Sequence, residues 1–262
     1  MPSFSDHPSN QRVKILITGD SGAGKSGCVA SLANAGYNVR ILDYDGGLDI
    51  LGRYLTPEGI ARTHYVTLQD DFKAGKATAW TRGLELLKHW KTPTEDLGPV
   101  SEWTDMDVLV IDSLTFAGEA AGRAVMQRNG NKMNGKPSQA DWYDIQREAQ
   151  QFITWLTSDD LVNCNLVVTA HLRGIVDKAT EEVKDYPMTP GVSLSRNVGR
   201  FFNSLVRIDT RMVGGKPKKY FRTIPDDKLD IKIVADVPPE VDISKLDEIF
   251  AAAKRGPVAV AA

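Results

Sequence analysis

The segment GDSGAGKS at residues 19–26 limits the fold of this chain more than any other feature of its sequence. It follows an apolar run rich in β-branched residues at 13–18 and precedes a helical pattern at 27–35 that Gly36 closes. Glycines let such a loop wrap closely, so that backbone N–H groups and the positive end of the helix point at phosphate oxygens. Lys25 would reach the β- and γ-phosphates of a nucleoside triphosphate, and the Ser26 hydroxyl would bind Mg²⁺. The complete pattern between a strand and a helix argues against a chance glycine-rich turn. The residues predicted to bind the nucleotide are Gly19, Asp20, Ser21, Gly22, Ala23, Gly24, Lys25, Ser26 and Gly27.

Further apolar runs alternate with helical patterns along the chain. Buried strands are predicted at 38–43, 64–68, 106–112 and 165–170, with a helix at 80–90 and two helices between the last two strands. The second of these two helices has a predicted buried stripe of Trp142, Ile145, Ala149, Phe152 and Leu156. Buried strands that alternate with helices indicate an α/β fold with a mostly parallel, twisted sheet and helices on both faces. In such folds ligands bind beyond the carboxyl ends of the strands.

The pattern changes after His171, where antiparallel hairpins are predicted. One of them has strands at 204–213 and 219–224 around the turn Gly214-Gly215, and it forms a C-terminal extension of the fold. A length of 262 residues fits one large α/β domain. We therefore expect a disordered leader at 1–12, a core at 13–240, and a C-terminal helix and tail at 241–262.

Acidic side chains follow two of the predicted strands. Asp112 ends the strand in VLVIDS and fits a second Mg²⁺ anchor beside the loop, although an N-cap for the next helix is the alternative. Asp43 and Asp45 stand at the end of the strand in ILDYDGGLD, where a carboxylate could polarise the water that attacks the γ-phosphate. Asp45 comes after the strand and is the better placed of the two. A turn aspartate before Gly46 is an equally good interpretation from turn statistics alone.

Three later features could carry further function. His171 ends its strand in VVTAHLR, where a side chain could sense the γ-phosphate, although a lone histidine is more often structural. Between Arg196 and Arg222 eight basic residues face a single acid, Asp209. Such a segment could neutralise a phosphate backbone, or it could be a solvated strand face whose charges pair with acids elsewhere. The polar stretch 129–140 is long for a connection, which indicates a functional or mobile loop.

Net charge, cysteine content and apolar runs limit the partners and the cellular compartment that we expect for this protein. A formal net charge of −2 does not by itself indicate nucleic-acid binding, because a net value can conceal a local basic patch. Cys28 and Cys164 lack the spacing of a metal site, and we expect two buried thiols in a reducing compartment. No apolar run approaches the roughly 20 residues that span a membrane, so we expect a cytoplasmic protein with no membrane partner.

In this order the motifs resemble those of the RecA-type recombinase core, and more closely those of the small phage-encoded RecA-core ATPases linked to single-strand annealing and recombination. The resemblance covers residues 13–225, from GDSGAGKS (Walker A) through ILDYDGGLD, VLVIDS (Walker B) and VVTAHLR to RFFNSLVRIDTR. It implies a DNA-stimulated ATPase that uses ATP with Mg²⁺. Lys25, Asp45 and His171 would be catalytic, and Ser26 and Asp112 would hold the metal. Two positions depart from the pattern, because RecA usually has glutamate at Asp45 and the family commonly has glutamine at His171.

The resemblance also implies two DNA-binding loops, near 129–140 and 178–200, and a homo-oligomeric ring or filament with the nucleotide between subunits. A basic residue of the neighbouring subunit would then touch the γ-phosphate. Arg222 is the closest match for this residue, and Lys218 and Lys219 are the reserves. A single-strand-binding protein could be a further partner. The residues expected to contact single-stranded DNA are Lys132, Lys136, Arg173, Lys178, Arg196 and Arg200.

The leading hypothesis is therefore an ATPase that binds single-stranded DNA and promotes annealing or strand exchange. A RecA-fold helicase or a regulatory ATPase that acts on a protein partner is the second hypothesis. A small-molecule kinase is the third, since many kinases carry the same phosphate loop. Those enzymes usually have an arginine-rich lid between helices, whereas the late part of this chain has the pattern of hairpins.

Overall fold

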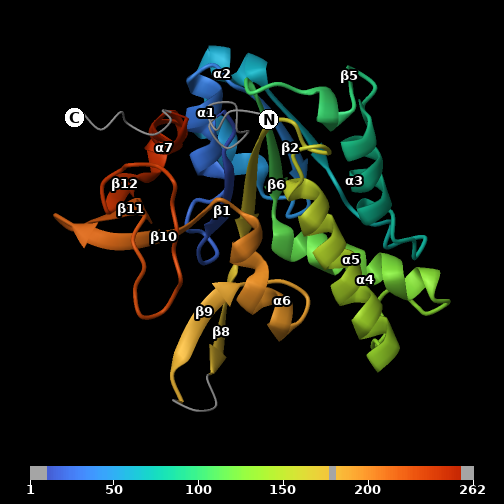
Figure 1. Ribbon diagram of the computed structural model, residues 1–262. Coiled ribbons are helices and arrows are strands. Elements are labelled where there is room, and N and C mark those ends of the chain that lie inside the picture. Colours follow the sequence, from blue (N-terminus) through green and yellow to red (C-terminus); the bar gives the residue numbers. More distant parts are fainter. Residues whose placement is uncertain (1–10, 177–180, 255–262) are drawn as a thin grey trace, which may run out of the picture.

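A single large sheet forms the centre of the computed structural model, which describes residues 11–176 and 181–254. Its strands are β1 (Lys14–Thr18), β2 (Asn38–Asp43), β3 (Thr63–Thr67), β6 (Asp107–Asp112), β7 (Asn165–Ala170), β10 (Ser204–Val213), β11 (Lys216–Arg222) and β12 (Glu240–Asp242). They lie in the order β12-β11-β10-β1-β7-β6-β2-β3 (Figure 1). The strands from β10 to β3 are parallel, and β11 and β12 are antiparallel to their neighbours. The predicted fold class, a mostly parallel sheet with a C-terminal antiparallel extension, is confirmed.

Helices cover both faces of this sheet. They are α1 (Ala30–Asn34), α2 (Pro57–Arg62), α3 (Ala79–Lys88), α4 (Leu114–Arg128), α5 (Gln139–Thr157), α6 (Val192–Asn197) and α7 (Leu246–Ala253). The helices α3, α4 and α5 pack on one face, and α1 and α7 pack on the other (Figure 1). Successive side chains of a strand point to opposite faces, so Leu16 joins the first core and Ile15 and Ile17 join the second. All of β1 is buried, which is why it reads as a continuous apolar run.

Most predicted elements are confirmed, and two need correction. The strands β2, β7 and β10 have the predicted bounds. The predicted helix at 27–35, however, begins with a 3₁₀ turn, η3 (Gly27–Val29), and then continues as α1. Gly36 comes directly after the helix and has φ +99°. The predicted stripe on α5 holds for its other members but is wrong for Trp142, which is 44% exposed. The N-terminal end of α5 extends beyond the sheet in Figure 1, so the first turn has no strand to cover.

Two small hairpins stand outside the main sheet. The strands β4 (Trp90–Lys91) and β5 (Asp96–Gly98) form the first, beside α3. The strands β8 (Leu172–Val176) and β9 (Val183–Pro187) form the second, which continues from β7 beyond the carboxyl ends of the parallel strands (Figure 1). The second hairpin therefore starts at the edge of the sheet where ligands are expected.

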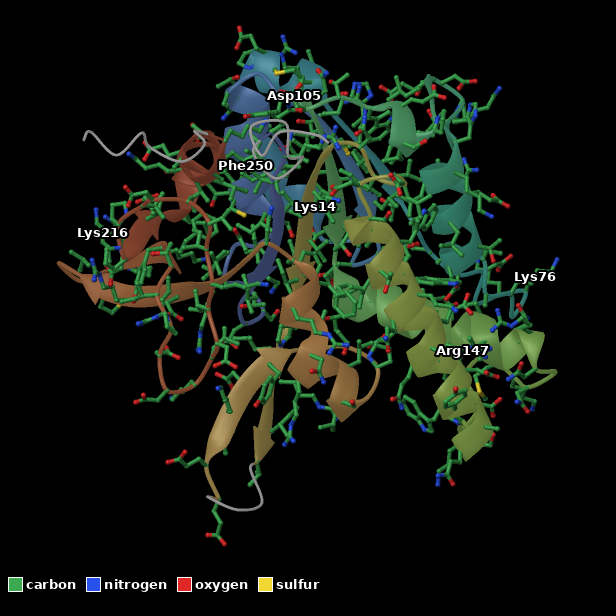
Figure 2. The ribbon with its side chains drawn as sticks, in the orientation of Figure 1. Lys14, Lys76, Asp105, Arg147, Lys216 and Phe250 are labelled. Atoms are coloured by element: carbon green, nitrogen blue, oxygen red, sulfur yellow. The ribbon has the colours of Figure 1, made fainter. Side chains whose placement is uncertain are left out.

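The last described segment packs into the same core as the first helix. The strand β12 pairs with β11, so this pairing joins the two sides of the expected boundary at 240. A short 3₁₀ turn, η7 (Ile243–Lys245), then leads into α7. Phe250 is buried between α7 and α1, edge-on to Tyr37 at 5.9 Å between ring centroids (Figure 2). Residues 1–10 of the expected leader and 255–262 of the expected tail lie outside the described residues.

The connection between α4 and α5 is held to the helices that it joins. The Asn129 side-chain amide donates to Asp141 at 2.9 Å, and Met133 is buried. Ser138 and Asp141 form a reciprocal capping box at the start of α5. The predicted mobile loop is thus shorter than expected, at 129–138, and has defined anchors.

Two further predictions concern the cysteines and the ability of the chain to cross a membrane. Cys28 and Cys164 are both buried free thiols, as expected. Within residues 11–176 and 181–254, no helix combines the length and the apolar character needed to cross a membrane.

Candidate active site

The phosphate loop joins the carboxyl end of β1 to η3, as the sequence predicts. Gly22 and Gly24 have φ of +74° and +106°, which L side chains rarely adopt, so glycine is required at both. The loop is closed by a turn in which the Ala23 N–H donates to the Asp20 carbonyl at 3.1 Å. These glycines and this turn together set the conformation of the loop.

Lys25 is folded onto the loop that carries it. Its ammonium donates to the carbonyl oxygens of Gly19 at 3.0 Å and Asp20 at 2.9 Å. The residue is buried, and burial lowers the pKa of its ammonium, against the opposing effects of nearby carboxylates, of which Asp112 and Asp45 are the largest. The ammonium of Lys25 thus has little water around it. When a nucleotide binds, phosphate oxygens would replace the two carbonyl oxygens as its hydrogen-bond partners.

Asp112 ends β6 beside this loop and has the surroundings of a metal anchor. Its carboxylate is buried and accepts a hydrogen bond from the Thr169 hydroxyl, while the other carboxylate oxygen, Oδ2, has no partner among the described residues. Burial raises the pKa of Asp112, and the hydroxyls of Ser26 and Thr169 and the charge of Lys25 counteract this rise. Mg²⁺ binds through one or two carboxylates and hydroxyls together with phosphates, and an unpartnered buried carboxylate oxygen beside Ser26 fits that requirement. The side chain does not cap α4, so the alternative interpretation of Asp112 is not supported.

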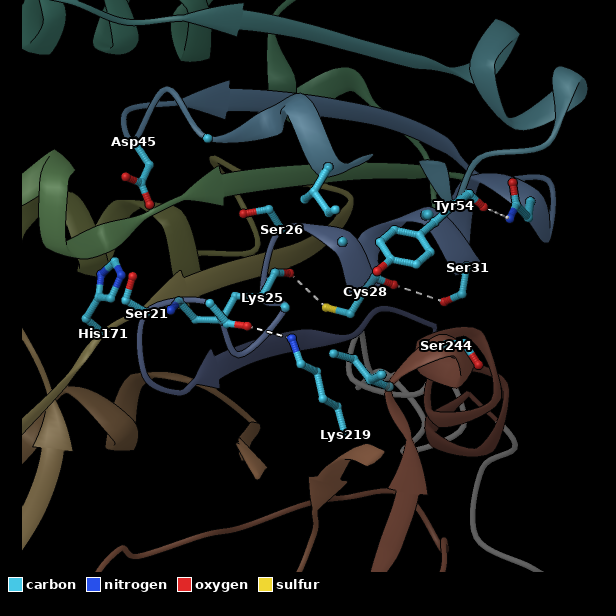
Figure 3. A pocket seen from close by; sticks show the side chains of 18 residues that line it. Ser21, Lys25, Ser26, Cys28, Ser31, Asp45, Tyr54, His171, Lys219 and Ser244 are labelled. Atoms are coloured by element: carbon cyan, nitrogen blue, oxygen red, sulfur yellow. Dashed lines mark hydrogen bonds between the residues drawn. The ribbon is translucent and has the colours of Figure 1, made fainter. Parts of the chain in front are cut away.

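Asp43 and Asp45 occupy different environments at the end of β2. The Asp43 carboxylate is buried and engaged, because it accepts from the Gly46 N–H at 2.7 Å and from the Thr67 hydroxyl at 3.1 Å. It therefore organises the turn. Asp45 is exposed and lines the same cavity as Lys25, with its carboxylate on the side of His171 (Figure 3). Of the two acids, Asp45 is the one with access to a ligand.

His171 lies at the end of β7 on the same side of the cavity as Asp45 (Figure 3). Burial, followed by the charge of Lys25, lowers the pKa of its imidazole, which favours the neutral ring at pH 7. The ring packs edge-on against Phe116 at 5.7 Å between centroids. Its backbone N–H donates to the Thr115 hydroxyl at 3.1 Å, so the strand end is tied to the first turn of α4.

A cavity of about 580 Å³ contains the loop and these side chains. Six of the predicted loop residues line it, namely Ser21, Gly22, Gly24, Lys25, Ser26 and Gly27, whereas Gly19, Asp20 and Ala23 shape the loop. Tyr54 and Ser244, which the sequence analysis missed, line the end of the cavity away from Asp45 and His171 (Figure 3). Ile243, also missed, lines the cavity as well. Tyr54 is exposed and lies only nine positions after Asp45, and no motif in the sequence marks it as a cavity residue.

Half of the basic residues in the segment that ends at Arg222 form ion pairs with carboxylates. Arg222 donates to Asp209 at 2.6 Å and does not line the cavity of its own chain. The same segment contains further ion pairs, which are Arg207 with Asp185 and Asp209, Arg211 with Glu240, and Lys218 with Asp242. Arg222 also lies 3.6 Å from Asp226, so the alternative that these charges pair with acids elsewhere is confirmed for four of the eight basic residues. A role for Arg222 in a neighbouring subunit stays a prediction. Lys219, one of its reserves, lines the cavity.

The residues expected to contact DNA are exposed where they are described, but they do not form one cluster. Lys132 and Lys136 lie on the connection between α4 and α5, Arg173 lies on β8, and Arg196 and Arg200 lie on and just after α6. The guanidinium groups of Arg196 and Arg200 stand over the rings of Tyr186 and Phe201, at 6.0 and 5.2 Å from the centroids. Lys178 lies outside the described residues.

A glycine loop after the first strand, a strand order in which β7 separates β1 from β6, and a buried acid at the end of β6 define a P-loop NTPase with a RecA-like core. A family model described as AAA domain matches residues 11–232, and the chain belongs to that family. A P-loop ATPase of this kind binds a nucleotide, typically with Mg²⁺.

A comparison of this chain with curated proteins found no match. Among solved structures, the flagellar accessory protein FlaH from Methanocaldococcus jannaschii is 13% identical with a TM-score of 0.42, and the alignment covers 80% of this chain and 78% of that one. The KaiC-like protein PH0186 from Pyrococcus horikoshii OT3 is 13% identical with a TM-score of 0.40, over 84% and 82% of the two chains.

Proposed function

We propose that this protein is a Mg²⁺-dependent ATP hydrolase whose nucleotide state controls the binding of single-stranded DNA during annealing or strand exchange. The observation that carries the proposal is a set of hydrogen bonds from the cavity to the β8–β9 hairpin. Thr115 accepts from the His171 N–H and donates to the Met188 carbonyl, each at 3.1 Å. The Met188 N–H also donates directly to the His171 carbonyl at 2.8 Å. The Thr115 hydroxyl therefore adds α4 to the connection between the end of β7 and the segment that follows β9.

The proposed roles in hydrolysis follow from the positions of the side chains. Lys25 exchanges its two loop carbonyls for phosphate oxygens, which are stronger partners because they are charged. Ser26 and Asp112 hold Mg²⁺, which would neutralise charge on the phosphates. Asp45 orients and polarises the attacking water, because its carboxylate is exposed to the cavity. Neutral His171 can donate a hydrogen bond to the γ-phosphate from one ring nitrogen.

Contacts at the base of the hairpin support the proposed coupling. A Cβ atom on Gly118 of α4 would lie 2.7 Å from Cδ of Pro190, so the segment after β9 rests directly against α4. A shift of His171 on binding the γ-phosphate would move Thr115 and this contact together. The bistable element of such a switch would be the hairpin, ordered in the ATP state and released after hydrolysis.

The surface next to the hairpin supports DNA as the partner. Arg196 and Arg200 present guanidinium planes beside Tyr186 and Phe201, and bases of a single strand stack on aromatic and guanidinium surfaces. Exposed Arg173 on β8 adds a contact for the phosphate backbone.

Replacing Thr115 by valine tests this coupling. We expect a non-hydrolysable ATP analogue to tighten binding of a labelled oligonucleotide to the wild-type protein by about 5- to 150-fold, the usual range of allosteric coupling. In Thr115→Val this ratio should fall towards one while nucleotide affinity is retained, because both hydrogen bonds to the hydroxyl are lost. Fluorescence anisotropy across a salt series measures both quantities. Thr154→Val is the control, since its hydroxyl bonds only to the Gln150 carbonyl within α5. An oligonucleotide affinity that the analogue leaves unchanged in the wild type would refute the DNA part of the proposal.

The proposed metal site makes a separate prediction. In Asp112→Asn the Mg²⁺ concentration for half-maximal ATP turnover should rise by about 10- to 100-fold, because the buried anchor loses its charge but keeps its shape. A magnesium titration of the turnover rate measures this change. Asp107→Asn, at the other end of the same strand, should titrate as the wild type does. The same curve for Asp112→Asn and the wild type would remove Asp112 from the metal site.

A regulatory ATPase with a protein partner is the second candidate. It is favoured by the ion pairs that neutralise the basic segment and by the exposed Val176 and Val183 on the β8–β9 hairpin. ATP turnover without DNA binding at any salt concentration would favour this function. The late region of the chain forms the β8–β9 and β10–β11 hairpins, which agrees poorly with the helical lid of a small-molecule kinase.

A further inference from the structure

The phosphate loop is contacted by a part of the chain far from it in sequence. The Lys219 ammonium, on β11, donates to the Gly22 carbonyl at 2.6 Å across 197 residues (Figure 3). Lys219 lines the same cavity as Lys25 and Ser26. The neighbouring Ile243 closes on the loop as well, since a Cβ atom on Gly24 would lie 2.7 Å from its Cδ1. A second lysine of the same chain thus stands at the nucleotide cavity.

The sheet fixes the position of this lysine. The strand β11 pairs with β10 on one side, where Thr210 is opposite Lys219, and with β12 on the other. Successive side chains of a strand point to opposite faces, so Lys218 is directed to Asp242, at 3.8 Å, while Lys219 is directed to the loop. Arg207, Arg211 and Arg222 have carboxylate partners, whereas Lys219 donates to a neutral carbonyl.

The two lysines at the cavity are in the same situation. Lys25, the phosphate ligand predicted from the motif, bonds to loop carbonyls, and Lys219 bonds to a loop carbonyl in the same way. An ammonium bonds more strongly to a charged phosphate oxygen than to a neutral carbonyl. Its flexible four-carbon stem lets the ammonium exchange one partner for the other without moving β11.

We propose that Lys219 is a phosphate ligand of the nucleotide bound by its own chain. On nucleotide binding, its ammonium leaves the Gly22 carbonyl for a phosphate oxygen, so both lysine ligands of the phosphates come from one subunit. This inference rests on the proposed nucleotide site but not on the proposed DNA partner. The sequence analysis named Lys219 as an alternative to Arg222 for a contact with the nucleotide of a neighbouring subunit. The present proposal instead places Lys219 at the nucleotide of its own subunit.

Removal of the charge tests the contact. In Lys219→Met the dissociation constant for Mg·ATP should rise by about tenfold or more, the usual effect of losing a hydrogen bond to a charged group. Lys219→Arg should keep most of the affinity, and the difference between Lys219→Met and the wild type should shrink as salt is added. The control is Lys216→Met, because Lys216 begins the same strand and lies at the outer end of the hairpin, away from the cavity (Figure 2). Equal Mg·ATP affinities for Lys219→Met and Lys216→Met would overturn the proposal.

A complementation experiment decides between action in cis and in trans. Lys25→Ala lacks the loop lysine but keeps Lys219, and Lys219→Met lacks only the second lysine. The two variants are co-expressed with different tags, purified through both tags in turn or mixed if they do not associate, and assayed for ATP turnover. Action in cis predicts no more turnover than the Lys219→Met subunits give alone. In the mixed assembly only the Lys219→Met subunits keep Lys25. If their turnover rises towards the wild-type rate, Lys219 of a neighbouring subunit acts on them, and action in cis is refuted.

The two proposals can fail separately. A wild-type protein that binds and hydrolyses ATP without any effect of DNA refutes the DNA partner, and the Lys219 experiments can still be read. A wild-type protein that binds no Mg·ATP refutes the nucleotide site and the role of Lys219 with it. Normal ATP binding and turnover in Lys219→Met refutes the role of Lys219 alone.

Discussion

Replacing Lys25 by methionine is expected to reduce ATP turnover by about 100- to 1,000-fold, the effect of removing one group that stabilises charge in the transition state. Methionine keeps the length of the stem and removes only the ammonium. Because the ammonium of Lys25 is buried among the loop carbonyls and beside Asp112, no water can take over its role as readily as it could at the surface. A coupled assay of phosphate release measures the change.

The control for this result is Lys88→Met, which changes an exposed lysine at the end of α3, outside the cavity. Its turnover should match the wild type. Thermal unfolding without nucleotide should show that Lys25→Met is folded, since the substitution removes a desolvated charge as well as its hydrogen bonds. A folded Lys25→Met protein with turnover within about tenfold of the wild type would contradict the assigned phosphate loop.

The second large effect is expected at Asp45. In Asp45→Asn the rate constant kcat should fall by about 100- to 10,000-fold, the range of general base catalysis, while the affinity for Mg·ATP changes little. Asparagine retains the size of the side chain but cannot accept a proton at neutral pH. Single-turnover kinetics together with equilibrium binding separate the two quantities.

Asp43→Asn is the informative comparison, because Asp43 ends the same strand but accepts hydrogen bonds from Gly46 and Thr67. We expect it to lower the melting temperature through the turn while the folded protein retains turnover. If kcat instead collapses in Asp43→Asn and not in Asp45→Asn, the assignment of the two acids is reversed.

The strands of the fold could be predicted because they are buried on both faces. The segments of β2 and β7 are mostly apolar and almost fully buried, and their bounds follow from the sequence. The strand β10 is buried only in its first half, and its charged second half could be predicted because it leads into the turn Gly214-Gly215 of a hairpin. Helix positions were predictable from spacing, but the extent of the surface that each helix meets was not. Trp142 has the spacing of a buried residue and is exposed because α5 begins beyond the sheet.

Some residues of the candidate site could likewise be predicted from the sequence, and others could not. The phosphate loop is a local motif, and Asp112 and His171 could be found because both end strands of a parallel sheet. The approach of Lys219 and Ile243 to the loop could not be found, because it depends on which strands become neighbours. The ion pairs of the basic segment were equally hidden, since Asp185 lies on β9 and Glu240 and Asp242 lie on β12, two strands whose positions the sequence does not give.

The pairing of β12 with β11 has a consequence for synthesis of the protein on the ribosome. The cavity wall formed by Lys219, Ile243 and Ser244 comes from β11 and η7, which are synthesised long after the phosphate loop. A nascent chain that ends before β11 has the loop but not this wall. Tight nucleotide binding is therefore expected only after β11 and β12 have joined the sheet and η7 has followed them.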